Sequence, residues 1–150
     1  MTEVRLFEPL LGSALAEVEA EAGQVEVGLA TLDAQLVTIE QTGERWFEAE
    51  IYRLRGEFLL RRLQSDATPA ESAFMRAIEI ARSQQARTFE LRAALSLAKL
   101  YHTMGRDHAA RDLLAPSLVG FSEGPELPEV ADANRLLILL GTCARVGMDG

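Results

Sequence analysis

Side chains that could carry out chemistry are few and widely spaced in this 150-residue chain. The only histidines, His102 and His108, stand six residues apart across an expected helix break, and the single cysteine, Cys143, is distant from both. A zinc site needs about four such ligands at short, regular spacings. The sequence therefore predicts no metal site.

No other catalytic or cofactor-binding pattern is present. Glu17, Glu19 and Glu21 fit a solvated helix face better than an acid–base pair, because such a pair needs a buried partner that shifts its pKa. The chain has no G-x-x-x-x-G-K-[ST] phosphate loop and no G-x-S-x-G nucleophile turn. We expect a protein that is not an enzyme, has no catalytic residue and needs no cofactor.

Charge and composition narrow the class of partner. The formal net charge of −8 argues against nucleic acid and against an anionic membrane, since both would require a basic surface. The lone cysteine, the absence of a signal-peptide pattern and the shortness of the longest apolar run, Leu136–Leu140, fit a cytoplasmic protein. We expect one domain over residues 1–150, with an apolar content of 48% that is enough for a core.

Helical periodicity runs almost from end to end, strand signals are nearly absent, and there is no Asn-Gly or Asp-Gly turn of the kind that joins two strands. Thr68 as N-cap, Pro69 at the first helical position and Glu71 three residues after the cap form a predicted capping box. Pro116 should kink the end of the sixth helix. The seven expected helices cover about Leu6–Glu21, Val25–Gln41, Glu44–Leu63, Pro69–Ser83, Thr88–Met104, Asp107–Phe121 and Glu129–Cys143.

Three helix pairs share a pattern of small and large residues. Each has a small residue in its first helix, a second small residue early in its second helix, and a large apolar residue four positions later. Small residues let two helix axes approach closely, and the large side chain fills the space beside that contact. The three sets are Ala16, Gly28 and Leu32; Gly56, Ala70 and Phe74; and Ala98, Ala110 and Leu114.

This pattern resembles the tetratricopeptide repeat (TPR), which is built from antiparallel helix pairs. Leu97, Tyr101 and Ala77 also match, whereas Gln35 and Ser117 stand where the first and third repeats would have an alanine. The spacing between repeats is 40 and 42 residues, against about 34 in a standard repeat. The helices or connections of this chain are therefore longer than usual.

The long-spaced variant is similar to the C-terminal TPR region of large bacterial signalling proteins. In these proteins a class III adenylate or guanylate cyclase, or a transcription-factor domain, is joined to an ATPase module. The stretches that carry the resemblance include TGERWFEAEIYRLRGEFLL and AFMRAIEIARSQQARTFELRAALSLAKLY, and it spans residues 10–140. It implies an all-α, right-handed superhelix with repeats at about 6–42, 44–86 and 88–122 and a terminal helix at about 127–143. Neither a cyclase nor an ATPase domain lies in these residues.

The third helix shows how apolar and charged side chains divide between faces. Phe47, Ile51, Leu54 and Phe58 form a stripe at helical spacing, which predicts core between helices and not a ligand surface. Trp46, at the start of the helix, either packs over the preceding turn or stands partly exposed.

The resemblance implies a concave groove lined by the first helix of each pair. Its charges would run from acidic at the N-terminal end to basic at the C-terminal end. The alternative is a solvated face held by pairs such as Arg53–Glu57 and Glu57–Arg61. The predicted groove residues are Ser13, Glu17, Glu21, Glu50, Arg53, Glu57, Arg61, Arg92, Leu95, Lys99 and His102.

We expect this groove to bind a protein or peptide segment, so that the chain acts as an interaction or regulatory module. The alternative is a structural or oligomerisation element that forms a homodimer through its C-terminal helix. Leu136, Leu139 and Leu140 are the residues expected at that interface, because a terminal helix should otherwise present a polar outer face.

Overall fold

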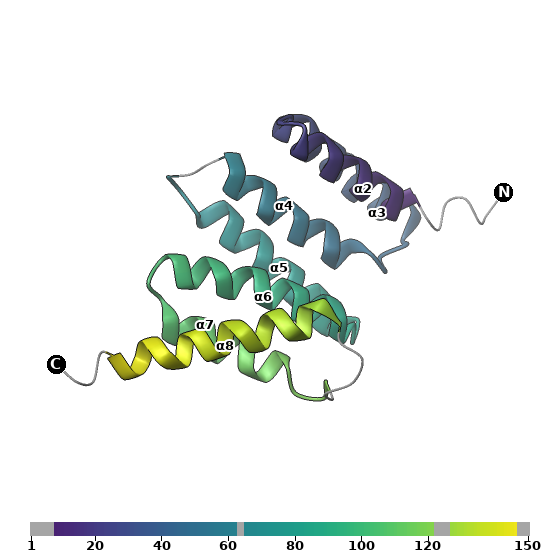
Figure 1. Cartoon of the computed structure of the whole chain (residues 1–150). Helices are drawn as coiled ribbons and strands as arrows, with labels where there is room; N and C mark the ends of the chain where they lie inside the picture. The colour runs from purple at the N-terminus through teal and green to yellow at the C-terminus, as the bar shows by residue number, and fades with distance from the viewer. Residues whose placement is uncertain (1–7, 63–64, 122–126, 147–150) are drawn as a thin grey trace.

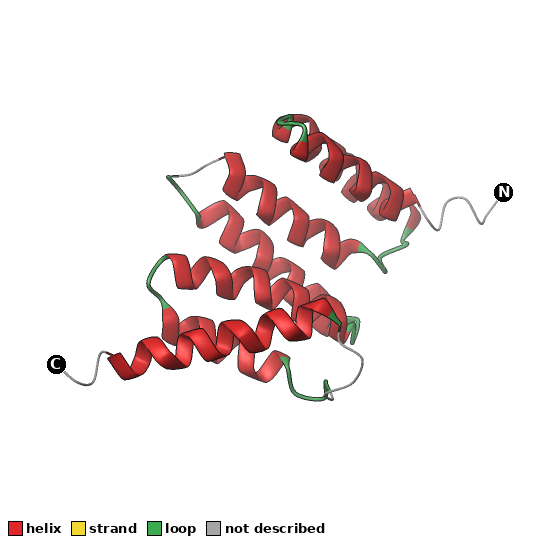
Figure 2. Cartoon of the chain, in the orientation of Figure 1, coloured by secondary structure: helices red, strands yellow, loops and turns green. Residues whose placement is uncertain are grey.

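The computed structural model describes residues 8–62, 65–121 and 127–146, with side chains to residue 141, and is all-helical over these ranges (Figures 1 and 2). The all-α prediction is therefore confirmed. None of the helices there is both long and apolar enough to cross a membrane. The helices are α2 Glu8–Glu21, α3 Val25–Thr42, α4 Glu48–Arg62, α5 Thr68–Ser83, α6 Arg87–Thr103, α7 Asp107–Ser117 and α8 Pro128–Val146.

Two helix ends differ clearly from the predicted ones. The third helix, α4, begins at Glu48 and not at Glu44, because Arg45 to Phe47 form a tight turn in which the Glu48 N–H donates to the Arg45 carbonyl. The helix α7 ends at Ser117, directly after Pro116, instead of continuing to Phe121. Instead of the kink expected at Pro116, the helix ends there. The predicted start of the first helix at Leu6 and the predicted end of the third helix at Leu63 lie outside the described residues.

The predicted capping box at the start of α5 is wrong. The Thr68 side chain makes no capping hydrogen bond, and Asp66 Oδ1 instead accepts one from the Thr68 backbone N–H at 2.9 Å. Glu71 faces away from the helix start, because its carboxylate accepts hydrogen bonds from Tyr101 Oη at 2.8 Å and from Arg106 at 3.2 Å. For Glu71, two hydrogen-bond donors from the next hairpin, Tyr101 and Arg106, are therefore preferred over the backbone N–H at the start of its own helix.

The helices stack as successive hairpins, α2/α3, α4/α5 and α6/α7 (Figure 1). Each first helix contacts the first helix of the next hairpin, in the order α2, α4, α6 and α8. The second helices α3, α5 and α7 do not contact one another within the described ranges. The stack therefore has a closely spaced row of first helices on one side. Because α8 packs on α6 and α7 as α4 packs on α2 and α3, α8 takes the place of a fourth first helix.

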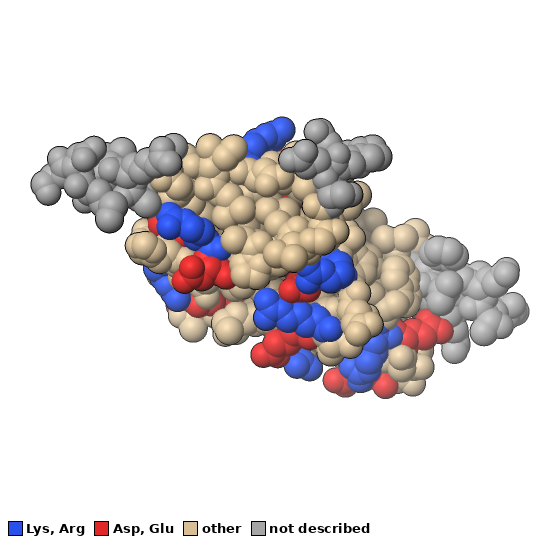
Figure 3. Space-filling model, turned by 90° about the horizontal axis from the view of Figure 1, so that it is seen from below, with Lys and Arg blue, Asp and Glu red and all other residues tan. Residues whose placement is uncertain are grey.

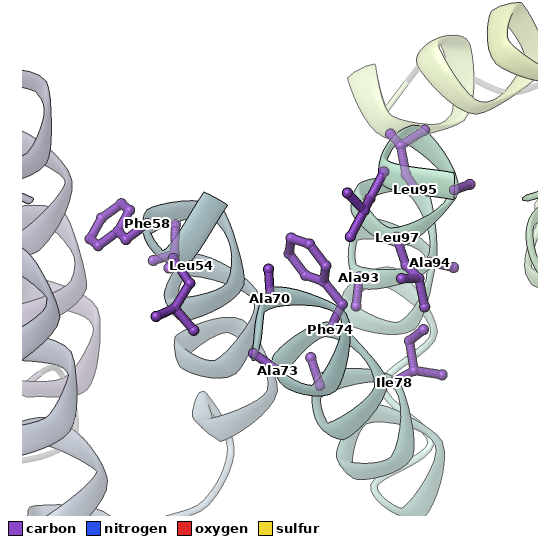
Figure 4. Close-up of a cluster of buried hydrophobic side chains, with 14 of the residues drawn as sticks. Leu54, Phe58, Ala70, Ala73, Phe74, Ile78, Ala93, Ala94, Leu95 and Leu97 are labelled. Atoms are coloured by element: carbon purple, nitrogen blue, oxygen red, sulfur yellow. The ribbon is translucent and has the colours of Figure 1, made fainter. Parts of the chain in front are cut away.

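The predicted pattern of small and large residues lies in the core, and its glycines mark close helix contacts in the first two hairpins. All nine of its residues are buried. A Cβ atom on Gly28 would lie 2.9 Å from the Ala16 carbonyl oxygen, and one on Gly56 would lie 2.5 Å from a ring carbon of Phe74. Figure 4 shows Phe74 among the buried side chains of α5 and α6. Close approach at Gly56 thus makes room for the buried Phe74 ring in the middle hairpin.

The departures from the repeat pattern have local compensation. Gln35 packs over Gly12, where an added Cβ would lie 2.4 Å from the Gln35 side chain, so the glycine leaves space for the longer residue. Ser117 is buried, and its hydroxyl donates to the Leu113 carbonyl at 3.0 Å. Trp46 is 39% exposed and rests on the Phe47 ring, with the ring centres 5.1 Å apart. The predicted stripe from Phe47 to Phe58 is buried in the core.

Replacing Gly56 with alanine should destabilise the fold although alanine is the better helix former. The new methyl group would overlap the fully buried Phe74 ring, and overpacking of this kind costs about 1 to 3 kcal/mol. Gly141→Ala is the matched control, since a Cβ there has open space around it and should raise the free energy of unfolding by about 0.5 to 1 kcal/mol. Urea denaturation of both variants measures the difference. Equal behaviour of the two would contradict the packing described.

Replacing Asp66 with alanine should lower the midpoint of thermal unfolding at neutral pH. The hydrogen bonds from Thr68 lower the pKa of Asp66, so its carboxylate stabilises the folded chain above the ordinary carboxyl pKa. That contribution is lost as the pH falls through the lowered pKa. Melting curves of wild type and Asp66→Ala should therefore differ at about pH 7 and converge at about pH 2. A difference that persists at low pH would show that the charge is not what matters.

Candidate functional site

The predicted groove follows the row of first helices, but the structure buries three of its eleven residues. Ser13, Glu50 and Leu95 are buried, and the Ser13 hydroxyl donates to the Leu10 carbonyl at 2.8 Å. These three residues support the helices and offer a partner no surface. The other eight predicted residues retain solvent exposure and lie on α2, α4 and α6.

Glu50 is the centre of an ionic network that links three first helices. Its carboxylate accepts two hydrogen bonds from Arg53, from Nη2 at 2.8 Å and from Nε at 3.0 Å. Arg92 of α6 approaches the same carboxylate, with Nη2 2.9 Å from Glu50 Oε1. Arg92 also reaches α8, where its Nε lies 3.3 Å from Glu129 Oε1. The network thus joins α4, α6 and α8 along the inner row.

Arg53 has further partners on its outer side. Its Nη1 lies 3.4 Å from Glu57 Oε1, and the same Glu57 oxygen accepts a hydrogen bond from Ser96 of α6 at 2.8 Å. Burial by itself would lower the pKa of Arg53, but the hydrogen bonds to Glu50 and the charges of Glu50, Glu57 and Glu17 together raise it. The predicted Arg53–Glu57 pair is therefore confirmed. A partly buried, permanently charged guanidinium now holds the network together.

The predicted change from acidic to basic along the groove does not survive this pairing. Arg53 and Arg92 are neutralised by carboxylates, and His102 Nδ1 lies 2.7 Å from Asp107 Oδ1. Lys99 is exposed and forms no ion pair with any described residue. At the C-terminal end of the row, Lys99 is therefore the one basic side chain without a carboxylate partner among the described residues. The sequence could not predict this, because Arg92 pairs with Glu50 and Glu129, which are distant from it in the chain.

A shallow depression of about 130 Å³ lies between α2 and α4. Leu54 and Phe58 form its apolar floor, and both are buried in the core below. Arg61 does not pair with Glu57; its guanidinium lies over the Phe58 ring, 5.7 Å from the ring centre. The charged rim consists of Glu17, Glu21, Arg53, Glu57 and Arg61.

The rim and floor together suit a long basic side chain. Because Arg53 is already paired with Glu50 and Glu57, the two remaining carboxylates, Glu17 and Glu21, outnumber the one uncommitted cation of the rim, Arg61. A lysine or arginine side chain can lay its methylene stem on an apolar floor while its charge meets carboxylates at the rim. The depression can therefore recognise one basic residue of a bound segment.

A second hollow, of about 420 Å³, lies between α4 and α5 and was not predicted. Two ion pairs border it, Arg45–Glu48 at 3.0 Å and Arg76–Glu79 at 3.3 Å. The only sequence signal for it is the spacing of three residues within each pair. Its charged groups are satisfied by each other, so it offers a ligand fewer free charges than the depression between α2 and α4.

The predicted self-association surface on α8 requires a correction. Leu136 and Leu140 are buried against the rest of the stack, because they share the face of α8 that packs on α6 and α7. Leu139 is 46% exposed and its neighbour Ile138 is 69% exposed. Seen from below, the molecule shows a broad area without charged side chains, bordered by acidic and basic groups lying side by side (Figure 3). Sequence reasoning missed Ile138 because it treated the apolar run as uniform.

The described part of the chain contains no group of three or more histidine, cysteine, aspartate or glutamate side chains able to hold a metal ion. No protein-family model, no curated protein and no solved structure matches this chain.

Replacing Glu50 with glutamine should destabilise the fold by roughly 2 to 4 kcal/mol, since it leaves Arg53 and Arg92 facing a neutral group in a buried position. Glu79→Gln is the control: its partner Arg76 is exposed, and such surface pairs contribute about 0 to 1 kcal/mol. Chemical denaturation gives both values. A Glu50→Gln effect no larger than that of Glu79→Gln would mean that the network adds no stability.

Proposed function

We propose that this chain is a non-catalytic, TPR-like interaction module that binds a protein or peptide segment along its row of first helices. The observation that carries the proposal is the depression between α2 and α4, with an apolar floor, an acidic rim and solvent access. The chain would serve as part of, or a descendant of, a larger bacterial signalling protein, as the sequence resemblance implies.

The arrangement of the helices supports this proposal. First helices contact their successors while second helices stay apart, which is how a stack of hairpins curves and forms a concave side. The right-handed superhelix of a TPR array is the form that we propose for this curvature. Its concave side would be the row of α2, α4, α6 and α8.

The chemistry of the depression specifies one feature of the bound segment. We infer that the segment presents a lysine or arginine to Glu17 and Glu21. The exposed Lys99, on α6, would meet an acidic residue farther along the segment. Charged pairs at such exposed rims mainly decide which partner is chosen and how fast it associates.

A panel of short synthetic peptides, each with one lysine or arginine, tests this assignment against matched peptides that have glutamate at the same position. Glu17→Lys should weaken binding of the basic peptides about tenfold, because it replaces attraction by repulsion at the rim. Glu40→Lys is the control, with the same charge change at an exposed site on α3. Fluorescence anisotropy measures the affinities. Reversal at Arg53 or Arg92 is unsuitable, since both hold buried Glu50.

Equal binding of basic and acidic peptides, or equal effects of Glu17→Lys and Glu40→Lys, would overturn the groove assignment. The second candidate function is assembly through α8, which the exposure of Ile138 favours. In that case Ile138→Glu would change the mass measured by light scattering, and Glu17→Lys would not.

A further inference from the structure

The first helix, α2, has an exposed apolar stripe opposite its buried face. Leu11, Leu15 and Val18 follow at intervals of four and three residues and are 64%, 54% and 63% exposed. The buried face of the same helix includes Ala16 and Ala20. We call Leu11, Leu15 and Val18 the α2 stripe. Among the described residues α2 is the first helix of the stack, and an exposed apolar stripe on it requires an explanation.

The repeat shows what the corresponding surface does elsewhere in the chain. Leu11 and Val18 correspond, 40 residues on, to Ile51 and Phe58 of α4, which are 0% and 1% exposed. Phe58 packs against the preceding hairpin, where its ring lies 3.1 Å from the position of a Cβ on Gly28. In α4 this face is therefore the one that docks on a helical neighbour. The α2 stripe is the same face with no described residue of this chain covering it.

The hairpin that carries the stripe is strongly acidic. Between residues 8 and 42 there is no lysine, arginine or histidine, so this hairpin carries seven negative charges of a chain whose net charge is −8. At 100° per residue, Glu8 and Glu19 flank the α2 stripe on one side and Glu21 flanks it on the other. The seven acidic residues are Glu8, Glu17, Glu19, Glu21, Glu26, Asp33 and Glu40.

The chain itself shows how a helix docks on this acidic hairpin. On the other side of the hairpin, α4 packs with an apolar face and adds arginines at the border: Arg55 Nε lies 2.9 Å from Asp33, and Arg62 lies 3.4 Å from Glu26. An apolar seam between basic and acidic borders is thus an interface that this hairpin already makes. The α2 stripe offers the same two features, an apolar seam and an acidic border, on the side of the hairpin that faces away from α4.

We propose that the α2 stripe binds a basic amphipathic helix of a partner protein, with apolar residues on the stripe and lysine or arginine beside Glu8, Glu19 and Glu21. A second copy of α2 fits poorly, because that helix has no basic residue and pairing two copies would bring like charges together. The stripe lies on a different face of α2 from Glu17 and shares only Glu21, at its border, with the depression described above.

A helical peptide of leucine and lysine, with leucines spaced by four and three residues, is the probe. The scrambled control has the same composition and charge but no apolar stripe. Leu15→Lys should weaken binding of the helical probe about tenfold or more, since it removes the leucine side chain that the probe would cover and adds repulsion with the lysines of the probe. Met75→Lys is the matched variant, at a comparably exposed apolar position on α5. Isothermal titration at physiological salt measures the binding of both probes to the wild type, Leu15→Lys, Met75→Lys and Glu17→Lys, and circular dichroism confirms that the variants fold.

Preference for the helical probe over the scrambled one, lost in Leu15→Lys and retained in Met75→Lys, would support the proposal. Equal binding of both probes would show general attraction to an acidic protein and overturn it. Loss of binding in Glu17→Lys with retention in Leu15→Lys would place the probe in the first-helix groove instead. A dimer seen by sedimentation that becomes a monomer only in Leu15→Lys would assign the stripe to a second copy of the chain, which also overturns the proposal.

Discussion

The close approach of helices at small residues is the constraint on which the rest of the structure depends. At Gly56 the Phe74 ring occupies the space that a Cβ would need, and at Gly28 a Cβ would touch the backbone of α2. Because the helices meet this closely, their spacing is set by backbone and ring atoms that cannot adjust. With α4 held in this way, both Arg53 of the same helix and Arg92 of α6 come within hydrogen-bond distance of the Glu50 carboxylate. The charged surface of the inner row thus follows from the packing of its smallest residues.

Pairing within the inner row separates structural charges from free ones. Glu50, Arg53, Arg92 and Glu129 hold helices together and are largely neutralised by each other. Such a buried network favours one alignment of the helices, since any shift along an axis would leave a charge without its partner. The charges left to meet other molecules are mainly the carboxylates of the first hairpin. The electrostatic character of the chain is therefore concentrated at its N-terminal end.

Local patterns in the sequence predict this structure well, whereas contacts between distant residues escape prediction. The small residues at Ala16, Gly56 and Ala98 were recognisable because their spacing repeats. The burial of Glu50 was not, since one of its two arginines lies three residues away and the other 42 residues away. The start of α5 was misread for a related reason: Glu71 has better partners in the next hairpin than at its own helix end. Patterns within one helix were reliable where no neighbour competed for the same side chain.

The two rows of the stack also differ in how they respond to force. First helices touch their successors, and ion pairs join α4 to α6 and α6 to α8, whereas α3, α5 and α7 make no contact with one another over the described ranges. Bending the stack would therefore leave the length of the inner row nearly constant and change the gaps between the second helices. The side of the stack formed by the first helices should therefore be stiffer than the side formed by the second helices. Its outer surface would change spacing on bending while the inner row keeps its geometry.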